Sequence, residues 1–208
     1  MSFWNDRVLP VLIEKACRSH AILEERKRWI PQAHGRVLEL GVGSGLNLPF
    51  YSRARARSVM GIDPSEALLA RARPRAIAAA VPVDLRQARA EELPFEDASF
   101  DSAVITYSLC SIPEPARALR ELRRVLVPGG VLFFAEHGRA PDADARRWQD
   151  RLTPPWRHMS GGCHLNRDPF ANLEEAGFRL EEQIASYGDG PRWLSFGYQG
   201  KAISEQST

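Results

Sequence analysis

Three glycines directly after a short apolar run constrain the fold of this chain more than any other feature. Residues 36–40 read Arg-Val-Leu-Glu-Leu, and Gly41, Gly43 and Gly45 follow with the spacing G-x-G-x-G. A short apolar run of this kind predicts a buried strand in a parallel sheet. Because glycine has no Cβ, such a turn lets a ligand approach the bare backbone at the end of the strand.

The spacing of these glycines and the acid before them indicate which ligand the turn favours. A dinucleotide-binding turn needs G-x-G-x-x-G, and here Leu46 occupies the position of the last glycine. Glu39 lies two residues before Gly41, where a carboxylate favours a cationic ligand that carries no phosphate. The alternative is an ordinary tight turn between a strand and a helix.

Length and composition predict one globular domain. The chain has 208 residues, 44% hydrophobic and 26% charged, which is enough for a full core and excludes a disordered chain. The net charge is only +2, so charge gives no reason to expect a nucleic-acid partner. No apolar stretch approaches the length of a membrane span and no signal peptide stands out, so we expect a cytoplasmic protein. The widely spaced Cys17, Cys110 and Cys163 predict free thiols and no bound metal.

Strand-like and helix-like segments alternate in the first two thirds of the chain, which predicts an α/β sheet. The turn Pro128-Gly129-Gly130 should separate the last of these helices from the strand after it. The expected strands cover residues 36–40, 58–62, 83–87, 102–106 and 131–135, and the expected helices cover 64–79 and 115–126.

The two ends of the chain follow other patterns. Residues 138–168 are polar, rich in Pro, Gly and Trp, and do not alternate cleanly. A short helix at 169–176 and strands at 178–186 and 193–203 follow, and the turn-rich link between the strands is typical of an antiparallel hairpin. Residues 10–29 predict one amphipathic helix, which either lies over the ligand site or only covers an edge of the sheet.

Asp63 is the second acidic residue that points to a ligand. It ends the second expected strand, 24 positions after Glu39, close to the acidic residue about 20 positions beyond a Rossmann glycine turn. A carboxylate there accepts hydrogen bonds from both hydroxyls of a ribose. Asp63 also suits the N-cap of the next helix, with Pro64 at the first helical position, and one residue can fill both roles.

The segment at 36–45 closely resembles motif I of the class I S-adenosylmethionine-dependent methyltransferases. Residues 88–101 resemble the stretch that lies over the adenine in that family, except that Arg89 replaces the usual aspartate. The resemblance implies a Rossmann-like α/β fold, a mostly parallel seven-stranded sheet with a C-terminal antiparallel hairpin, and S-adenosylmethionine as cofactor. The cofactor-binding residues that it implies are Glu39, Gly41, Gly43, Gly45, Asp63, Pro64, Ala90, Glu91 and Tyr107.

Several later segments resemble one subgroup, the small methyltransferase-like proteins that include microsomal alkyl-thiol S-methyltransferases. These segments are residues 109–112, 122–130, 136–137 and 162–167. The start of the core also looks like bacterial phosphatidylethanolamine N-methyltransferases and quinone-biosynthesis C-methyltransferases. We therefore expect a small, fairly apolar acceptor, first a thiol and second a phospholipid amine or quinone, with peripheral lipid contact left open. A nicotinamide-dependent oxidoreductase and a non-catalytic binding module are the alternatives from other classes.

Candidates for acceptor chemistry cluster where the chain is least regular. His137 follows the fifth expected strand and suits a general base, or else a hydrogen-bonded histidine at a strand end. Cys163 and His164 are adjacent, so their side chains should point apart, and packing is the expected role of Cys163. Trp148 and Trp156 either line an acceptor pocket or anchor the segment. The expected division is a helical cap at 1–34, a cofactor core at 35–137, an acceptor-side insert at 138–168, and a helix and hairpin at 169–208.

Overall fold

A single seven-stranded sheet forms the centre of the computed structural model, which describes residues 11, 14, 17 and 19–205. Its strand order is β3-β2-β1-β4-β5-β7-β6. β1 to β5 are parallel, and β7 runs antiparallel between β5 and β6. The predicted fold class and the C-terminal hairpin are confirmed. The strands are β1 Gly35–Leu40, β2 Ala56–Asp63, β3 Val83–Gln87, β4 Phe100–Thr106, β5 Leu126–His137, β6 Phe178–Tyr187 and β7 Phe196–Ser204.

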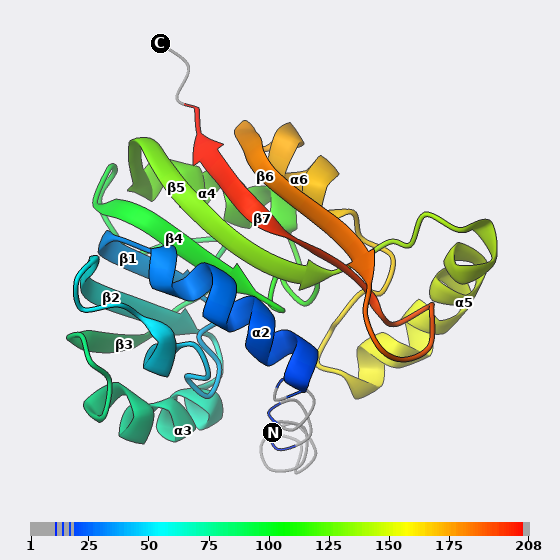
Figure 1. Cartoon of the computed structure of the whole chain (residues 1–208), viewed down its shortest axis with the longest axis horizontal. Coiled ribbons are helices and arrows are strands. Elements are labelled where there is room, and N and C mark those ends of the chain that lie inside the picture. Colours follow the sequence, from blue (N-terminus) through cyan, green and yellow to red (C-terminus); the bar gives the residue numbers. More distant parts are fainter. Residues whose placement is uncertain (1–10, 12–13, 15–16, 18, 206–208) are drawn as a thin grey trace.

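Helices cover both faces of this sheet (Figure 1). Alternate residues of the central strands face opposite sides, so Val37 packs with Trp29 of α2 on one face and Leu38 packs with Leu122 of α4 on the other. The helices are α2 His20–Trp29, α3 Glu66–Ile77, α4 Pro115–Val125, α5 Ala143–Met159 and α6 Pro169–Glu175, with short 3-10 helices at Ile30–Gln32 and Leu48–Phe50. No helix in the described part of the chain is long and apolar enough to cross a membrane.

The predicted helix over 10–29 is interrupted. α2 begins only at His20, because the ψ of 153° at Ser19 is extended and breaks a helix at that residue. Leu12 and Ala16, which the prediction placed on its apolar face, lie outside the described residues. Trp29 is fully buried in the core, and its Nε1 donates a hydrogen bond to Gln199 of β7. This end of α2 therefore covers the sheet at β7, which is not an edge strand, and Arg26 of the same helix lines a cavity at the ends of the parallel strands.

The predicted irregular insert contains a long helix, α5, which hydrophobic periodicity did not reveal. Its buried residues are Ala145, Gln149 and Thr153, which have helical spacing but only one apolar member. Pro154 and Pro155 lie inside it, although proline usually interrupts a helix. Gln149 fixes the helix in place because its side chain accepts from the backbone N–H of Ala140 and donates to the carbonyl of Gly138.

The predicted turn at 128–130 lies within β5. α4 ends at Val125, and β5 begins directly at Leu126. Phe100 of β4 pairs with Leu126, whereas Ser102 pairs with Val131, so the Pro-Gly-Gly segment forms a bulge in the strand.

Candidate functional site

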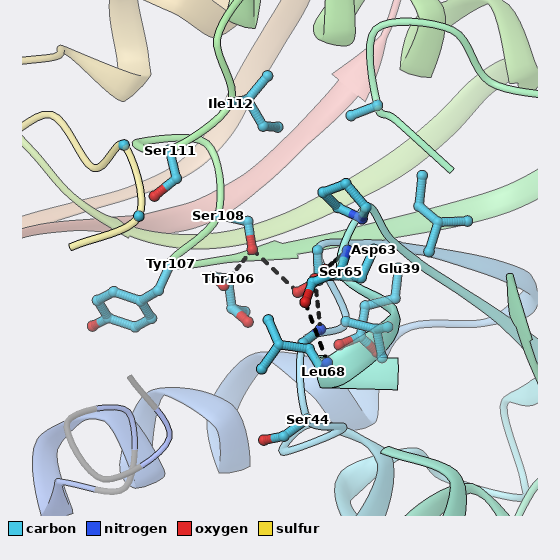
Figure 2. Close-up of a pocket in the computed structure, with 18 of the residues that line it drawn as sticks. Glu39, Ser44, Asp63, Ser65, Leu68, Thr106, Tyr107, Ser108, Ser111 and Ile112 are labelled. Carbon is cyan, nitrogen blue, oxygen red and sulfur yellow. Dashed lines mark hydrogen bonds between the residues drawn. The ribbon is translucent and has the colours of Figure 1, made fainter. Parts of the chain in front are cut away.

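A cavity of about 740 Å³ opens at the carboxyl ends of β1, β2 and β4 (Figure 2). β1 lies between β2 and β4, so the strand order reverses at this point, and open α/β sheets bind ligands at such a switch. All predicted cofactor-binding residues except Gly45 line the cavity: Glu39, Gly41, Gly43, Asp63, Pro64, Ala90, Glu91 and Tyr107.

The three glycines of the turn have different surroundings. All have positive φ, between +55° and +80°. At Gly43 an added Cβ would meet no atom nearer than 3.9 Å and would enter the cavity, whereas at Gly41 it would overlap Ser108 Oγ. At Gly45 it would lie 2.9 Å from Leu48 and 3.2 Å from Ala72 of α3. Gly45 therefore allows the turn to pack against α3 and does not line the site.

Asp63 connects β2 to the glycine turn. Its Oδ2 accepts from the backbone N–H of Gly43 at 3.1 Å, and its Oδ1 accepts from the N–H of Ser65 at 2.8 Å. Burial raises the pKa of this carboxyl. The expected N-cap role is wrong, because Ser65 caps α3 and accepts from the N–H of Leu68 with its side chain.

Glu39 lies at the centre of a buried hydrogen-bond network. Its oxygens accept from Asn47 Nδ2 at 2.9 Å and from the hydroxyl of Tyr51 at 2.7 Å, and burial raises its pKa to about 7. Asn47 in turn accepts from Arg26 Nε of α2 at 2.8 Å. Arg26 and Asn47 also line the cavity. Sequence reasoning missed both, since neither belongs to a motif.

Arg89, the residue that departs from the family pattern, pairs with its neighbour Glu91. Its Nη2 lies 3.3 Å from Glu91 Oε1, and the carboxylate is buried while the arginine side chain is largely exposed. Ala90 lies between them on the cavity wall. The arginine thus compensates the charge of Glu91 at the predicted adenine end.

Tyr107 lies between this cavity and a second one. Its φ of +52° is rare for a residue with a side chain. The phenol hydroxyl donates to Glu25 of α2 at 2.5 Å, and burial raises the pKa of Tyr107. The hydrogen bond ties the end of β4 to α2, which closes the site from one side.

The second cavity has a volume of about 390 Å³ and shares Cys17, Tyr107 and Ser111 with the first. It lies between α2, the end of α5 and the segment before β7. Trp156 lines it, whereas Trp148 is 53% exposed and is not part of the wall. Its apolar walls come from Ala21, Ile22, Trp156, Pro191, Leu194 and Phe196.

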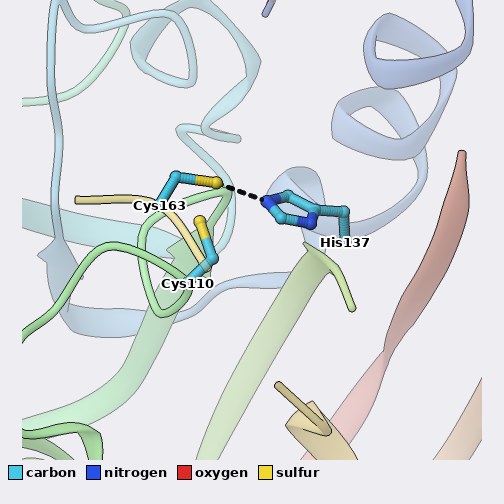
Figure 3. Close-up of side chains that lie close together, drawn as sticks. All are labelled: Cys110, His137 and Cys163. Atoms are coloured by element: carbon cyan, nitrogen blue, oxygen red, sulfur yellow. Dashed lines mark hydrogen bonds between the residues drawn. The ribbon is translucent and has the colours of Figure 1, made fainter. Parts of the chain in front are cut away.

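Cys110, His137 and Cys163 meet on the wall of this second cavity. Figure 3 shows the three side chains together. Their Nε2 and Sγ atoms all lie within 4.8 Å of one another, and His137 Nε2 is 3.0 Å from Cys163 Sγ. Trp156 Nε1 donates to Cys163 Sγ at 3.3 Å. Sequence reasoning treated His137 and Cys163 separately and gave Cys163 only a packing role.

Two side chains fix the loop that carries Cys110. Arg167 Nη1 donates to the carbonyls of Leu109, Cys110 and Ile112 at 2.7–2.9 Å. The buried Oε1 of Glu136 accepts from the backbone N–H groups of Ser108 and Leu109. Burial raises the pKa of Glu136. The loop after β4 is therefore held from both sides.

Comparisons with known proteins agree with this geometry. The methyltransferase domain family matches residues 38–134. The chain is 34% identical to the thiol S-methyltransferase TMT1B of Homo sapiens, over 89% of this chain and 81% of the relative. It is 46% identical to the phosphatidylethanolamine N-methyltransferase of Cereibacter sphaeroides, over 50% of this chain and 51% of the relative.

Solved structures share the fold at low sequence identity. An S-adenosylmethionine-dependent methyltransferase from Mesorhizobium loti superposes with a TM-score of 0.67 at 23% identity, covering 89% of this chain and 98% of that one. The cyclase SpnF superposes with a TM-score of 0.68 at 22% identity, covering 88% and 79%, so the fold alone does not fix the reaction. Because a thiol S-methyltransferase is 34% identical over most of this chain and the methyltransferase domain family matches its core, the chain belongs to the class I S-adenosylmethionine-dependent methyltransferases.

Proposed function

We propose that the two adjoining cavities are the donor and acceptor halves of one methyl-transfer site. The observation that carries this proposal is that they share Cys17, Tyr107 and Ser111 on their walls. A donor in the larger cavity and an acceptor in the smaller one meet across these residues. Methyl transfer requires this, because the reacting atoms must approach to about 3–3.5 Å in line.

The larger cavity fits S-adenosylmethionine. Its volume of about 740 Å³ lies within the range of about 300–1,000 Å³ typical of ligand pockets. The bare backbone at Gly43 leaves room for a ligand. When bound, the cofactor supplies a methyl group on a sulfonium, which is already a good leaving group. The protein then has to orient the reactants and exclude water.

Individual residues of this cavity have distinct proposed roles toward the cofactor. Asp63 accepts from the ribose hydroxyls, and Glu39 faces the cationic amino-acid end. Gly41 and Gly43 pass under the methionine part. The remaining predicted contacts are Pro64, Ala90, Glu91 and Tyr107, which all line the cavity.

For the acceptor we propose a small, fairly apolar thiol. The mostly apolar wall of the smaller cavity supports this, since burying an ammonium costs far more than burying a neutral thiol. The thiol S-methyltransferase TMT1B relatives support the same class. A phospholipid amine is the main competitor, because of the phosphatidylethanolamine N-methyltransferase relative.

We propose His137 as the catalytic residue on the acceptor side. It lies on the wall of the smaller cavity, with Nε2 beside Cys163 Sγ. A thiol attacks as its thiolate, so the acceptor must lose its proton in this smaller cavity, beside His137. In the proposed division, residues 1–34 cap the core at 35–137, residues 138–168 form the acceptor side, and residues 169–208 complete the sheet.

The test is S-adenosylhomocysteine formation by the purified protein, with alkyl thiols of increasing chain length and with phosphatidylethanolamine vesicles. We expect turnover of thiols and a KM that falls as the chain lengthens. His137→Ala should lower the rate by about 10²-fold or more and leave S-adenosylmethionine affinity unchanged. Methylation of phosphatidylethanolamine without activity on any alkyl thiol would replace the thiol by the phospholipid.

Two tryptophans of α5 provide a matched pair for locating the acceptor. Trp156 lines the smaller cavity, and Trp148 is exposed away from it. Trp156→Ala should raise the KM for the thiol by about tenfold, equal to about 1.4 kcal/mol, whereas Trp148→Ala should not. Equal KM values for the two variants would place the acceptor elsewhere.

A further inference from the structure

We propose that Cys110, His137 and Cys163 form a zinc site whose open coordination position faces the acceptor cavity. The three ligand atoms lie within 4.8 Å of one another, and all three residues line that cavity. Zinc prefers thiolate and imidazole ligands, and catalytic zinc sites have three protein ligands and one open position. The part of this inference that concerns the acceptor rests on the proposed function, whereas metal binding does not.

The spacing of the three ligand atoms suits a tetrahedral ion after a small adjustment. With Zn–S of about 2.3 Å and Zn–N of about 2.0–2.1 Å, ligand atoms stand about 3.6–3.8 Å apart. His137 Nε2 and Cys163 Sγ are 3.0 Å apart, and no pair of the three exceeds 4.8 Å. Side-chain rotations that move each ligand atom by less than about 1 Å therefore bring the three atoms to the separations that a zinc ion needs.

The surrounding structure holds the two cysteine segments together without an ion. The backbone N–H of His164 donates to the carbonyl of Cys110 at 2.9 Å, which joins the loop after α5 to the loop after β4. Arg167 Nη1 also donates to this carbonyl, at 2.9 Å. His137 belongs to β5 and pairs with Gly197 of β7. Ligands fixed in this way lose little conformational freedom when they bind a metal.

Trp156 supplies a contact of the kind that supports metal ligands. Its Nε1 donates to Cys163 Sγ at 3.3 Å, and hydrogen bonds to ligand atoms orient them and tune the metal. The sequence-based expectation of no metal rested on chain spacing. That argument does not apply here, because the ligands come from the loop after β4, the end of β5 and the loop after α5.

A metal at this position would take over the deprotonation of the acceptor, and His137 would then act as a ligand of the ion and not as a free base. An incoming alkyl thiol binds the open position as its thiolate, because a coordinated thiol loses its proton outright, and the proton passes to solvent. The thiolate sulfur then forms the new bond to the methyl carbon. The bond from that carbon to the sulfonium sulfur breaks, and its electron pair stays on that sulfur. The product is a neutral thioether, a poorer ligand than a thiolate, and it leaves.

Cobalt titration of the metal-free, reduced protein tests the site directly. Co²⁺ replaces Zn²⁺ and gives an absorption band when thiolates bind it. We expect one equivalent to bind the wild type. Cys110→Ser and Cys163→Ser should each weaken binding by more than the roughly 10–100-fold typical of losing an outer-shell partner. Cys17→Ser is the matched control, since Cys17 lines the same cavity outside the group of three, and it should bind like the wild type.

The outcomes separate the metal from the acceptor. An alkyl thiol added to the cobalt protein should shift the absorption band, which reports coordination without turnover. If the wild type binds S-adenosylmethionine and methylates thiols but binds neither Co²⁺ nor Zn²⁺, the zinc site is overturned and the proposed function stands. If cobalt binds and no thiol perturbs the band or is methylated, the site stands and the thiol assignment falls. Equal cobalt affinity in wild type and Cys163→Ser also overturns the site.

Discussion

At the scale of single residues, Gly43 and Asp63 test the cofactor assignment most directly. Gly43→Val should abolish S-adenosylmethionine binding, because the new side chain enters the cavity. Asp63→Ala should weaken binding by about 1.5–3 kcal/mol, the range for a hydrogen bond to a charged group. Calorimetry measures both affinities.

Gly129→Val is the matched control for Gly43→Val, since Gly129 also has positive φ and open space around it but lies away from the cavity. Equal affinity in wild type and Gly43→Val would contradict the assignment.

We expect Glu39 to make cofactor binding depend on pH. Burial raises its pKa to about 7, so in the free protein the carboxyl keeps its proton between about pH 4.5 and 7, where the unfolded chain loses it. Through this group, the free energy of unfolding of the cofactor-free protein falls as pH rises across that window. A cationic ligand end beside Glu39 favours the carboxylate, so binding should release a proton and strengthen from about pH 5 to 7.

The proton released on binding is measurable by calorimetry in two buffers with different heats of ionisation. Near pH 6 we expect the wild type to release close to one proton per bound S-adenosylmethionine. Glu39→Gln should release none, and its affinity should change little with pH. The same proton release in both proteins would mean that another group titrates.

At the scale of elements, Glu14, which precedes α2, links the wall of the proposed cofactor cavity to α3 through a cluster of charges. Glu14 lines the cavity and accepts from Arg71 Nε at 2.9 Å and from Arg75 Nη2 at 2.7 Å, both on α3. The side chain of Glu14 is only 8% exposed, whereas Arg71 is 40% and Arg75 is 27% exposed, so solvent screens these contacts in part. Glu14→Gln should speed S-adenosylmethionine release by about tenfold, equal to about 1.4 kcal/mol.

Stopped-flow displacement of bound cofactor measures this release rate. Glu66→Gln is the control. Glu66 lies on α3, the helix that carries Arg71 and Arg75, and it pairs with Arg73 at an exposed position. Such exposed pairs contribute little. Its release rate should match the wild type. If Glu14→Gln releases cofactor no faster than Glu66→Gln, the contacts of Glu14 with α3 do not slow cofactor release.

Some helices and strands were predictable from the sequence and others were not. β1 was predicted from its short apolar run, and α4 was predictable because its buried apolar residues, such as Leu119 and Leu122, repeat with the period of a helix. α5 was missed because Gln149 and Thr153 occupy its inward face. The proposed cofactor residues lie at or next to strand ends, so the positions of Glu39, Gly43 and Asp63 in the chain were enough to predict that they line one site.

The acceptor side was less predictable for a physical reason. Cys110, His137 and Cys163 come from three elements, and only the packing of β4, β5 and α5 brings them together. The same holds for Arg26, which reaches the site through Asn47. The spacing of residues along the chain does not reveal which side chains from different elements meet in the fold.

At the scale of the whole molecule, the proposed cofactor cavity is built from elements that are far apart in the sequence. Its walls come from α2 and from the ends of β1, β2 and β4, and Trp29 anchors α2 to β7. A ligand that binds only this assembled form stabilises the native state as a whole. At 100 times its Kd the gain is about 2.7 kcal/mol.

That gain predicts a shift in thermal unfolding. For a chain of this size, 1 kcal/mol raises Tm by about 2–4 °C, so saturating S-adenosylhomocysteine should raise it by about 5–10 °C. Scanning calorimetry should show one transition that moves as a unit, since sheet and cavity unfold together. The Gly129→Val control should shift like the wild type and Gly43→Val should not. A ligand-dependent shift confined to a minor, early transition would mean that the cofactor stabilises only the N-terminal segment, and the cavity would then not be coupled to the sheet.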